Sequence, residues 1–133
     1  MTRAVLADSG PLFAIADETD GLHERALREF ELFARDQWEI LVPYPILLEA
    51  YTLALFNLGQ KGASDWLSQI LSSVFISPTT EDYRRATTQV LALTGQSVTL
   101  VDATVAAIAA RLGLQVWTYD YHFDVMRAPV WRL

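Results

Sequence analysis

Residues 3–11, Arg-Ala-Val-Leu-Ala-Asp-Ser-Gly-Pro, decide the fold of this 133-residue chain. Residues 3–7 predict a short buried strand that ends at Asp8. Ser9 and Pro11 are then typical of the first turn of a helix that continues to residue 16. A short apolar strand followed at once by a helix is the beginning of a strand–helix–strand unit. The first elements of the chain therefore favour an α/β fold.

The same alternation continues to the end of the chain. Further strands are predicted at residues 39–43, 74–77 and 115–118, with a short final one at 129–132. Further helices are predicted at residues 22–36, from 45 to a stop at Gly59, and at 62–73, 78–93 and 103–112. Strands of four or five residues between helices indicate a parallel sheet covered on both faces. We therefore predict a single domain, residues 1–133, with a three-layer α/β sandwich and a short, mainly parallel sheet of four to five strands.

Composition excludes several classes of protein. Hydrophobic residues make up 52% of the chain, and the absence of cysteine excludes disulfides and a thiol nucleophile. The longest apolar region, residues 46–58, is interrupted by Glu49 and Asn57, so no membrane span is predicted. No signal peptide precedes Asp8, and we expect a cytoplasmic protein. The net charge of −6 argues against the basic surface of a generic nucleic-acid binder.

Two predicted helices carry distinct patterns. Residues 22–36 are amphipathic, and Glu29 is expected on the charged, solvent-facing side with Arg25, Arg28 and Arg35. The helix that begins at Pro45 is instead apolar on nearly every face. Its apolar stripe, continued into the next helix, is either core or a docking surface: Leu47, Tyr51, Ala54, Leu55, Leu58, Trp66 and Ile70.

Four acidic residues stand alone among apolar neighbours: Asp8, Glu49, Asp102 and Asp120. Asp8 and Asp120 follow the ends of predicted strands, whereas Glu49 and Asp102 lie near the starts of predicted helices. The carboxyl ends of parallel strands and the starts of the helices that follow them share one edge of a sheet. We therefore expect the four carboxylates in a single crevice.

A divalent cation would resolve the repulsion among these carboxylates, which otherwise raise one another's pKa. Oxygen ligands favour Mg²⁺ or Mn²⁺ over zinc or copper. We predict Asp8, Glu49, Asp102 and Asp120 as metal-binding and catalytic residues, with phosphodiester hydrolysis as the natural chemistry. Glu49 is expected either to complete the metal site or to orient the attacking water.

Local explanations exist for three of the acids. Asp8 is a possible helix cap, Asp102 follows Thr99 in a capping-box pattern, and Asp120 is a candidate for an Asx turn. Glu49 lacks such an explanation. Its structural alternative is a buried partner, such as Tyr44 or Arg111.

Other polar residues near the four acids are predicted to support the site or to lie outside it. Ser9 and Thr118 are candidates to orient the carboxylates by hydrogen bonds, although both also suit the end of a strand. His122 is expected at the rim of the site and His23 at a helix start. Asp124 is expected in a solvated loop, with an orienting role behind the metal ligands as the alternative, because it can share the turn with Asp120.

The acids in their contexts resemble the PIN domain family of VapC-type toxins. The resemblance covers nearly the whole chain and is carried by residues 6–12 (Leu-Ala-Asp-Ser-Gly-Pro-Leu), 20–26 (Asp-Gly-Leu-His-Glu-Arg-Ala), 47–51 (Leu-Leu-Glu-Ala-Tyr), 99–103 (Thr-Leu-Val-Asp-Ala) and 118–123 (Thr-Tyr-Asp-Tyr-His-Phe). No single segment is specific for the family. Together, the order of the segments and the length of the chain make the resemblance specific.

The resemblance implies a divalent-metal-dependent endoribonuclease that acts on RNA, is commonly a homodimer and is neutralised by a cognate antitoxin. The apolar stripe would then serve either the core or one of these partners. One alternative is a non-catalytic PIN-like interaction module. Another is a different acid-site phosphohydrolase, which fits less well because Gly10 stands where a haloacid-dehalogenase-type phosphatase has an acid. Lys61, the only lysine, is not at the late position that a receiver domain requires.

Overall fold

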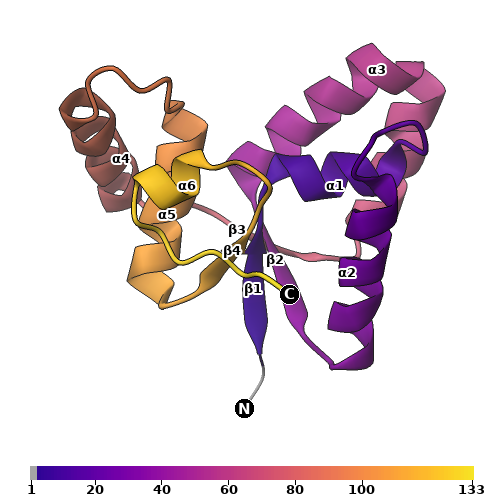
Figure 1. Ribbon diagram of the computed structural model, residues 1–133. Helices are drawn as coiled ribbons and strands as arrows, with labels where there is room; N and C mark the ends of the chain where they lie inside the picture. Colours follow the sequence, from indigo (N-terminus) through magenta and orange to yellow (C-terminus); the bar gives the residue numbers. More distant parts are fainter. Residues whose placement is uncertain (1–2) are drawn as a thin grey trace.

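The computed structural model describes residues 3–133 and shows a four-stranded, fully parallel sheet (Figure 1). The strands are β1 (Ala4–Ala7), β2 (Glu39–Pro43), β3 (Val74–Ile76) and β4 (Gln115–Trp117). Their order across the sheet is β3-β2-β1-β4, so β1 lies at the centre between β2 and β4. The predicted parallel sheet is therefore confirmed, and β1 occupies the position where two neighbouring strands can place side chains beside its end.

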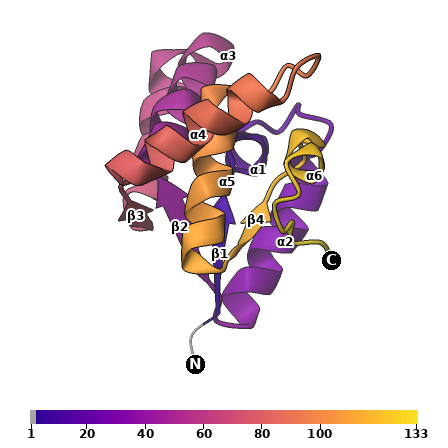
Figure 2. The same ribbon diagram turned by 90° about the vertical axis from the view of Figure 1, so that its left-hand side faces the viewer.

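Helices cover both faces of the sheet. They are α1 (Ser9–Ala16), α2 (His23–Arg35), α3 (Tyr44–Ile70), α4 (Thr80–Ala92), α5 (Leu100–Leu112) and α6 (His122–Val125). Helices α1, α2 and α3 lie on one side of the sheet, and α4, α5 and α6 lie on the other (Figure 1). Seen from the second side, α4 and α5 lie in front of the strands (Figure 2). The predicted three-layer sandwich is confirmed.

The predicted final strand at residues 129–132 is wrong in extent. A single parallel bridge joins Val130 to Val116, with Val116 N donating to Pro129 O at 2.8 Å and Trp131 N donating to Val116 O at 2.9 Å. Pro129 has no N–H group and so cannot extend a hydrogen-bonded ladder. The C-terminal segment therefore follows β4 without becoming a fifth strand.

The predicted helix stop at Gly59 is an interruption within α3. Gly59 has φ 75° and ψ 177°, and helical hydrogen bonding resumes after it up to Ile70. This backbone conformation is open to glycine and strained for other residues. The helix changes direction there (Figure 1). The part of α3 that carries Glu49 thus forms its own straight segment beginning at Tyr44.

The apolar stripe predicted along α3 belongs mainly to the core. Ala54, Trp66 and Ile70 are buried, and the other members except Leu55 pack partly buried against them. Large apolar side chains are nevertheless exposed on another side of the helix, most of all Phe56 at 82%. Among residues 3–133, no helix has both the length and the apolar character needed to cross a membrane.

Helix α2 packs one apolar side against the sheet, but its charged side is not fully solvated. Ala26 and Phe33 are buried, and the Phe33 ring lies 5.1 Å from that of Trp117, measured between centroids. Glu29, which the pattern places toward solvent, is only 3% exposed. The prediction for Glu29 is wrong because α2 passes the end of β4, where other side chains offer it hydrogen bonds.

Candidate functional site

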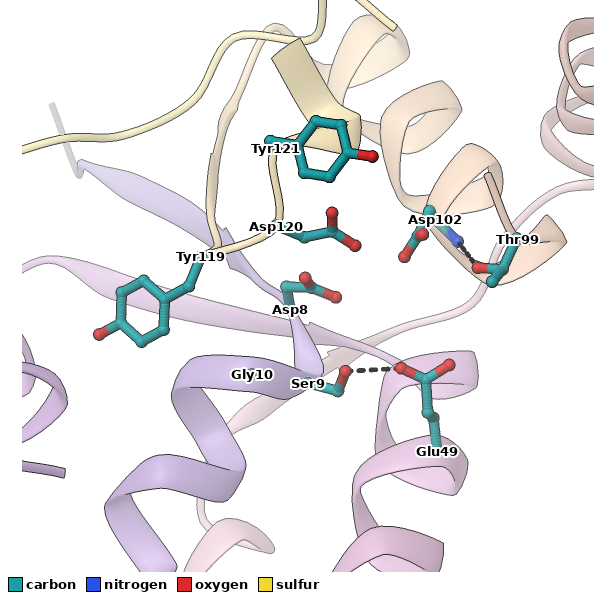
Figure 3. Close-up of a pocket in the computed structure, with 9 residues that line it drawn as sticks. All are labelled: Asp8, Ser9, Gly10, Glu49, Thr99, Asp102, Tyr119, Asp120 and Tyr121. Carbon is teal, nitrogen blue, oxygen red and sulfur yellow. Dashed lines mark hydrogen bonds between the residues drawn. The ribbon is translucent and has the colours of Figure 1, made fainter. Parts of the chain in front are cut away.

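The carboxylates of Asp8, Glu49, Asp102 and Asp120 line one open cavity of about 480 Å³ at the carboxyl edge of the sheet. Each comes from a different segment. Asp8 directly follows β1, Glu49 lies in the second turn of α3, Asp102 lies in the first turn of α5, and Asp120 lies in the loop after β4. Figure 3 shows all four side chains directed toward the same space. The structure therefore brings together the residues that the sequence singles out.

Asp8 is the most deeply buried of the four, at 4% exposure. Its backbone N–H continues the sheet by donating to Trp117 O at 3.0 Å. Its Oδ2 accepts a hydrogen bond from Thr118 Oγ1 at 2.7 Å, whereas its Oδ1 is buried without a hydrogen-bond partner among the described residues. Its side chain makes no capping hydrogen bond to α1, so helix capping does not explain this residue.

Burial raises the pKa of Asp8 to about 7, and the negative charges of Asp102 and Glu49 add to this effect. The hydrogen bond from Thr118 acts in the opposite direction but is outweighed. An unpartnered oxygen of a buried carboxylate is unfavourable in the ionised form. Within residues 3–133, the lining of the cavity offers Asp8 no lysine or arginine as a partner.

Asp102 lies in the first turn of α5, whose N-cap is Thr99. Asp102 N donates to Thr99 Oγ1 at 3.0 Å, so the local capping explanation is correct for the backbone of this residue. The side chain is directed toward Asp120 (Figure 3) and is almost fully buried. Burial and the charge of Asp120 both raise the pKa of Asp102. Capping alone does not account for this close pair of acids.

Asp120 forms the Asx turn that its sequence context suggests, since its Oδ1 accepts a hydrogen bond from His122 N at 2.9 Å. The same oxygen lies 3.1 Å from His122 Nδ1. Potential ligand atoms of Asp102, Asp120 and His122 all lie within 4.8 Å of one another. His122 is thus in contact with the acids, closer than the rim position expected for it. Its spacing of two residues from Asp120 is the sequence signal that could have shown this.

Glu49 is half-buried and accepts a hydrogen bond at Oε1 from Ser9 Oγ at 2.5 Å. The structural partners considered for it are wrong. The Tyr44 ring stacks on Phe75, and Arg111 pairs with Asp82 at 2.8 Å. Glu49 is therefore held by a residue of the site itself.

Two tyrosines for which the sequence predicted no role, Tyr119 and Tyr121, also line the cavity. They flank Asp120, and the side chain of Tyr119 points away from the carboxylates (Figure 3). Asp124 lies outside this group; it is exposed and pairs with Arg132 at 2.7 Å. His23 begins α2 as expected and contacts Ala14 O through Nδ1.

The donor set fits a hard divalent cation. Among the described residues, the cavity lining includes four carboxylates and no lysine or arginine. The buried Oδ1 of Asp8 has no protein partner, and oxygen atoms of this kind are the ligands that Mg²⁺ and Mn²⁺ prefer. The arrangement can therefore bind such a cation and, through it, a phosphate group.

Three solved structures share this fold over almost the entire chain. VapC20 of Mycobacterium tuberculosis, a toxin that cleaves the sarcin–ricin loop, is 21% identical with a TM-score of 0.85, over 97% of this chain and 99% of its own. VapBC2 of Rickettsia felis, in a structure bound to a DNA fragment from the VapBC2 promoter, is 14% identical with a TM-score of 0.74, over 96% of both chains. A toxin–antitoxin complex from Klebsiella pneumoniae is 16% identical with a TM-score of 0.68, also over 96% of both chains.

The TM-scores show a common fold, and at sequence identities below 25% they show the fold alone. No curated protein matches the chain in sequence. The model of the family described as PIN domain, however, matches residues 5–129, a range that includes all four carboxylates of the cavity. The chain belongs to the PIN domain family.

Proposed function

We propose that the protein is a Mg²⁺- or Mn²⁺-dependent endoribonuclease and the toxin of a toxin–antitoxin pair. The observation that carries this proposal is the buried, unpartnered Oδ1 of Asp8 in a cavity with three further carboxylates. Membership of the PIN domain family and the toxins among the similar structures support it. A non-catalytic interaction module would have no need of this costly arrangement.

Asp8, Asp102 and Asp120 are the residues that would hold the ion, directly or through water. Glu49, held by Ser9 Oγ, would complete the site or orient the attacking water. A divalent cation bound there would lower the pKa of a water molecule and stabilise negative charge on the phosphate. We assign all four carboxylates both metal-binding and catalytic roles.

The remaining groups of the site orient the acids. Thr118 Oγ1 donates to Asp8 and accepts from Asp120 N at 3.0 Å, so one hydroxyl fixes two of the acids relative to each other. Asp102 lies at the N-terminus of α5, where the helix dipole favours an ionised carboxylate. These contacts restrict the motion of the carboxylates and thereby favour one ligand geometry.

We infer an RNA substrate from membership of the PIN domain family and from the similar toxin VapC20, which cleaves the sarcin–ricin loop. The net charge of −6 makes general attraction of RNA weak, so the bound cation would supply the main attraction for a phosphate. The complexes among the similar structures support a cognate antitoxin and, with it, a cytoplasmic location. The exposed Leu48 and Phe56 of α3 support a protein interface, either with that antitoxin or in a homodimer.

The test is cleavage of a labelled RNA by purified variants. Asp8→Asn and Asp102→Asn are expected to remove Mn²⁺-dependent cleavage while the circular dichroism spectrum stays that of the folded protein. Asp124→Asn is the matched control, because Asp124 is an exposed acid paired with Arg132. Full activity in both site variants would contradict the assignment. Mn²⁺ binding without any cleavage of varied RNAs would count against the nuclease.

A further inference from the structure

Glu29 of α2 is a buried carboxylate that the proposed chemistry does not use. It is 3% exposed and accepts three hydrogen bonds from side chains. Its Oε1 accepts from Trp117 Nε1 at 3.0 Å and from Tyr119 Oη at 2.5 Å, and its Oε2 accepts from Arg25 Nε at 3.4 Å. Burial of a charge is costly, and an apolar side chain of similar size would fill the same space. The specific contacts of Glu29 therefore need an explanation beyond packing.

One oxygen of Glu29 holds the two residues that flank Thr118. Along residues 117–120 the contacts alternate: Trp117 and Tyr119 bond to Glu29, whereas Thr118 bonds to Asp8 and to the backbone of Asp120. Trp117 is the last residue of β4, where successive side chains point to opposite sides of the sheet. The hydrogen bonds show the same alternation in the residues that follow the strand. If Glu29 fixes the side chains of Trp117 and Tyr119, the backbone between them is fixed as well. The positions of Thr118 and Asp120 follow from that backbone.

Tyr119 connects Glu29 to the cavity. Tyr119 is one of the residues that line the cavity, and its side chain points away from the carboxylates (Figure 3). Its hydroxyl donates to Glu29. The Arg25 guanidinium lies 4.4 Å from the ring centroid, so the ring is held from two directions.

We propose that Glu29 is a positioning residue for the metal site. By anchoring Trp117 and Tyr119 it sets the path of residues 117–120, and this path places Thr118 against Asp8 and Asp120 beside Asp102. This inference rests on the proposed metal-binding function. Glu29 lies 88 residues from Trp117 in sequence, and through Trp117 and Tyr119 it influences the affinity of the site for a divalent cation.

The test compares Mn²⁺ affinity with stability in the purified full chain. Glu29→Leu removes both acceptors, Tyr119→Phe removes only the hydroxyl, and Glu29→Gln keeps one oxygen that can accept from Trp117 and Tyr119. Asp82→Asn is the matched control. Asp82 is also a buried, hydrogen-bonded acid, but its partners are Arg111 and Thr79. Calorimetric titration with Mn²⁺ gives the affinity, and thermal unfolding in a chelator gives the stability.

Outer groups that orient ligands typically contribute about 10–100-fold to metal affinity. We expect Glu29→Leu to weaken Mn²⁺ binding by about this factor. Tyr119→Phe should weaken it less, and Glu29→Gln should restore most of the affinity. Asp82→Asn should lower stability and leave the affinity unchanged.

Three results would overturn the proposal. The first is unchanged Mn²⁺ affinity in Tyr119→Phe and in any folded Glu29→Leu protein. The second is a Glu29→Gln protein as weak as Glu29→Leu. The third is an equal loss of affinity in Asp82→Asn, which would show that lowered stability alone is responsible. Tyr119→Phe keeps the test decisive if Glu29→Leu does not fold. Failure of the wild type to bind Mn²⁺ would instead contradict the proposed function itself, and the role of Glu29 with it.

Discussion

Thr118 Oγ1 donates a 2.7 Å hydrogen bond to Asp8 Oδ2 across 110 residues of sequence. This bond links the ends of β1 and β4, which are neighbours in the sheet. It satisfies Oδ2 of Asp8, whereas Oδ1 is buried and has no hydrogen-bond donor among residues 3–133. The pair therefore defines which carboxylate oxygen is available for a cation.

Thr118→Val removes the hydroxyl while keeping the shape of the side chain. Asp8 Oδ2 loses its donor and Asp120 N loses its acceptor, so we expect the free energy of unfolding in a chelator to fall by about 1–3 kcal/mol. Mn²⁺ affinity should fall as well, because both acids lose a fixed orientation. Urea unfolding and Mn²⁺ titration measure the two effects. Thr118→Ser, which keeps the hydroxyl, should behave like the wild type; equal losses in both variants would exclude a role for this hydrogen bond.

Asp8→Asn should stabilise the protein in the absence of divalent cations. The substitution removes a buried charge that has one unpartnered oxygen. We expect a gain of about 1 kcal/mol in the free energy of unfolding, which corresponds to a rise in Tm of about 3–5 °C in a domain of this size. Thermal unfolding with a chelator measures this gain.

In the presence of Mn²⁺, the wild type should instead be more stable than Asp8→Asn. The wild type gains stability from an ion that binds only the folded state, and the variant gains little. A variant that is less stable than the wild type in the chelator would show that Asp8 contributes to folding as an ordinary paired acid.

The hydrogen bond from Ser9 to Glu49 should be energetically coupled to activity. Ser9→Ala releases the Glu49 carboxylate, and we expect cleavage to slow by about 10-fold. Glu49→Gln should slow it at least as much. Since both changes affect one contact, the double variant should be no slower than Glu49→Gln alone. Additive effects of the two substitutions would show that Ser9 acts independently of Glu49.

Asp82 and Arg111 tie α4 to α5 away from the acid site. The hydrogen bonds from Arg111 hold the pKa of Asp82 below its usual value of 3.8. A lowered pKa in the folded state means that the stabilisation is present above the unfolded pKa and is lost as the pH falls through the folded pKa. We expect Asp82→Asn to lower the free energy of unfolding at pH 7.

The difference between wild type and Asp82→Asn should shrink as the pH falls below about 4, the region in which an unfolded aspartate titrates. Urea unfolding of both proteins between pH 7 and pH 3 measures it. A difference that is the same at every pH would show that the charge of Asp82 has no part in the stabilisation.

The sequence predicted the sheet and the meeting of the four acids because both depend on local patterns. Short apolar strands alternate with helices, and each acid follows a strand or opens a helix. The strand expected at residues 129–132 was wrong because Pro129 cannot donate, which matters only once its position beside Val116 is known.

Glu29 was misplaced for a related reason. Helical periodicity assigns it to the charged side of α2, yet its partners Trp117 and Tyr119 are 88 and 90 residues away. Helical periodicity indicates which residues lie on the same side of one helix. It does not indicate whether polar groups of another element face that side. Ser9 and Thr118 were by contrast correctly predicted to orient carboxylates. The local patterns did not show which acid each hydroxyl contacts, because Ser9 and Glu49 lie on different helices.

The central claim is that the four carboxylates form one site for a divalent cation. Its most direct test is calorimetric titration of Mn²⁺ into the wild type and into Asp102→Asn, after treatment of both proteins with a chelator. Asp102 is suited to this comparison because it is buried beside Asp120 and its backbone capping bond to Thr99 survives the substitution. We predict that the wild type binds Mn²⁺ saturably and that Asp102→Asn loses most of this Mn²⁺ affinity. Absence of binding by the wild type, or equal binding by both proteins, would contradict it.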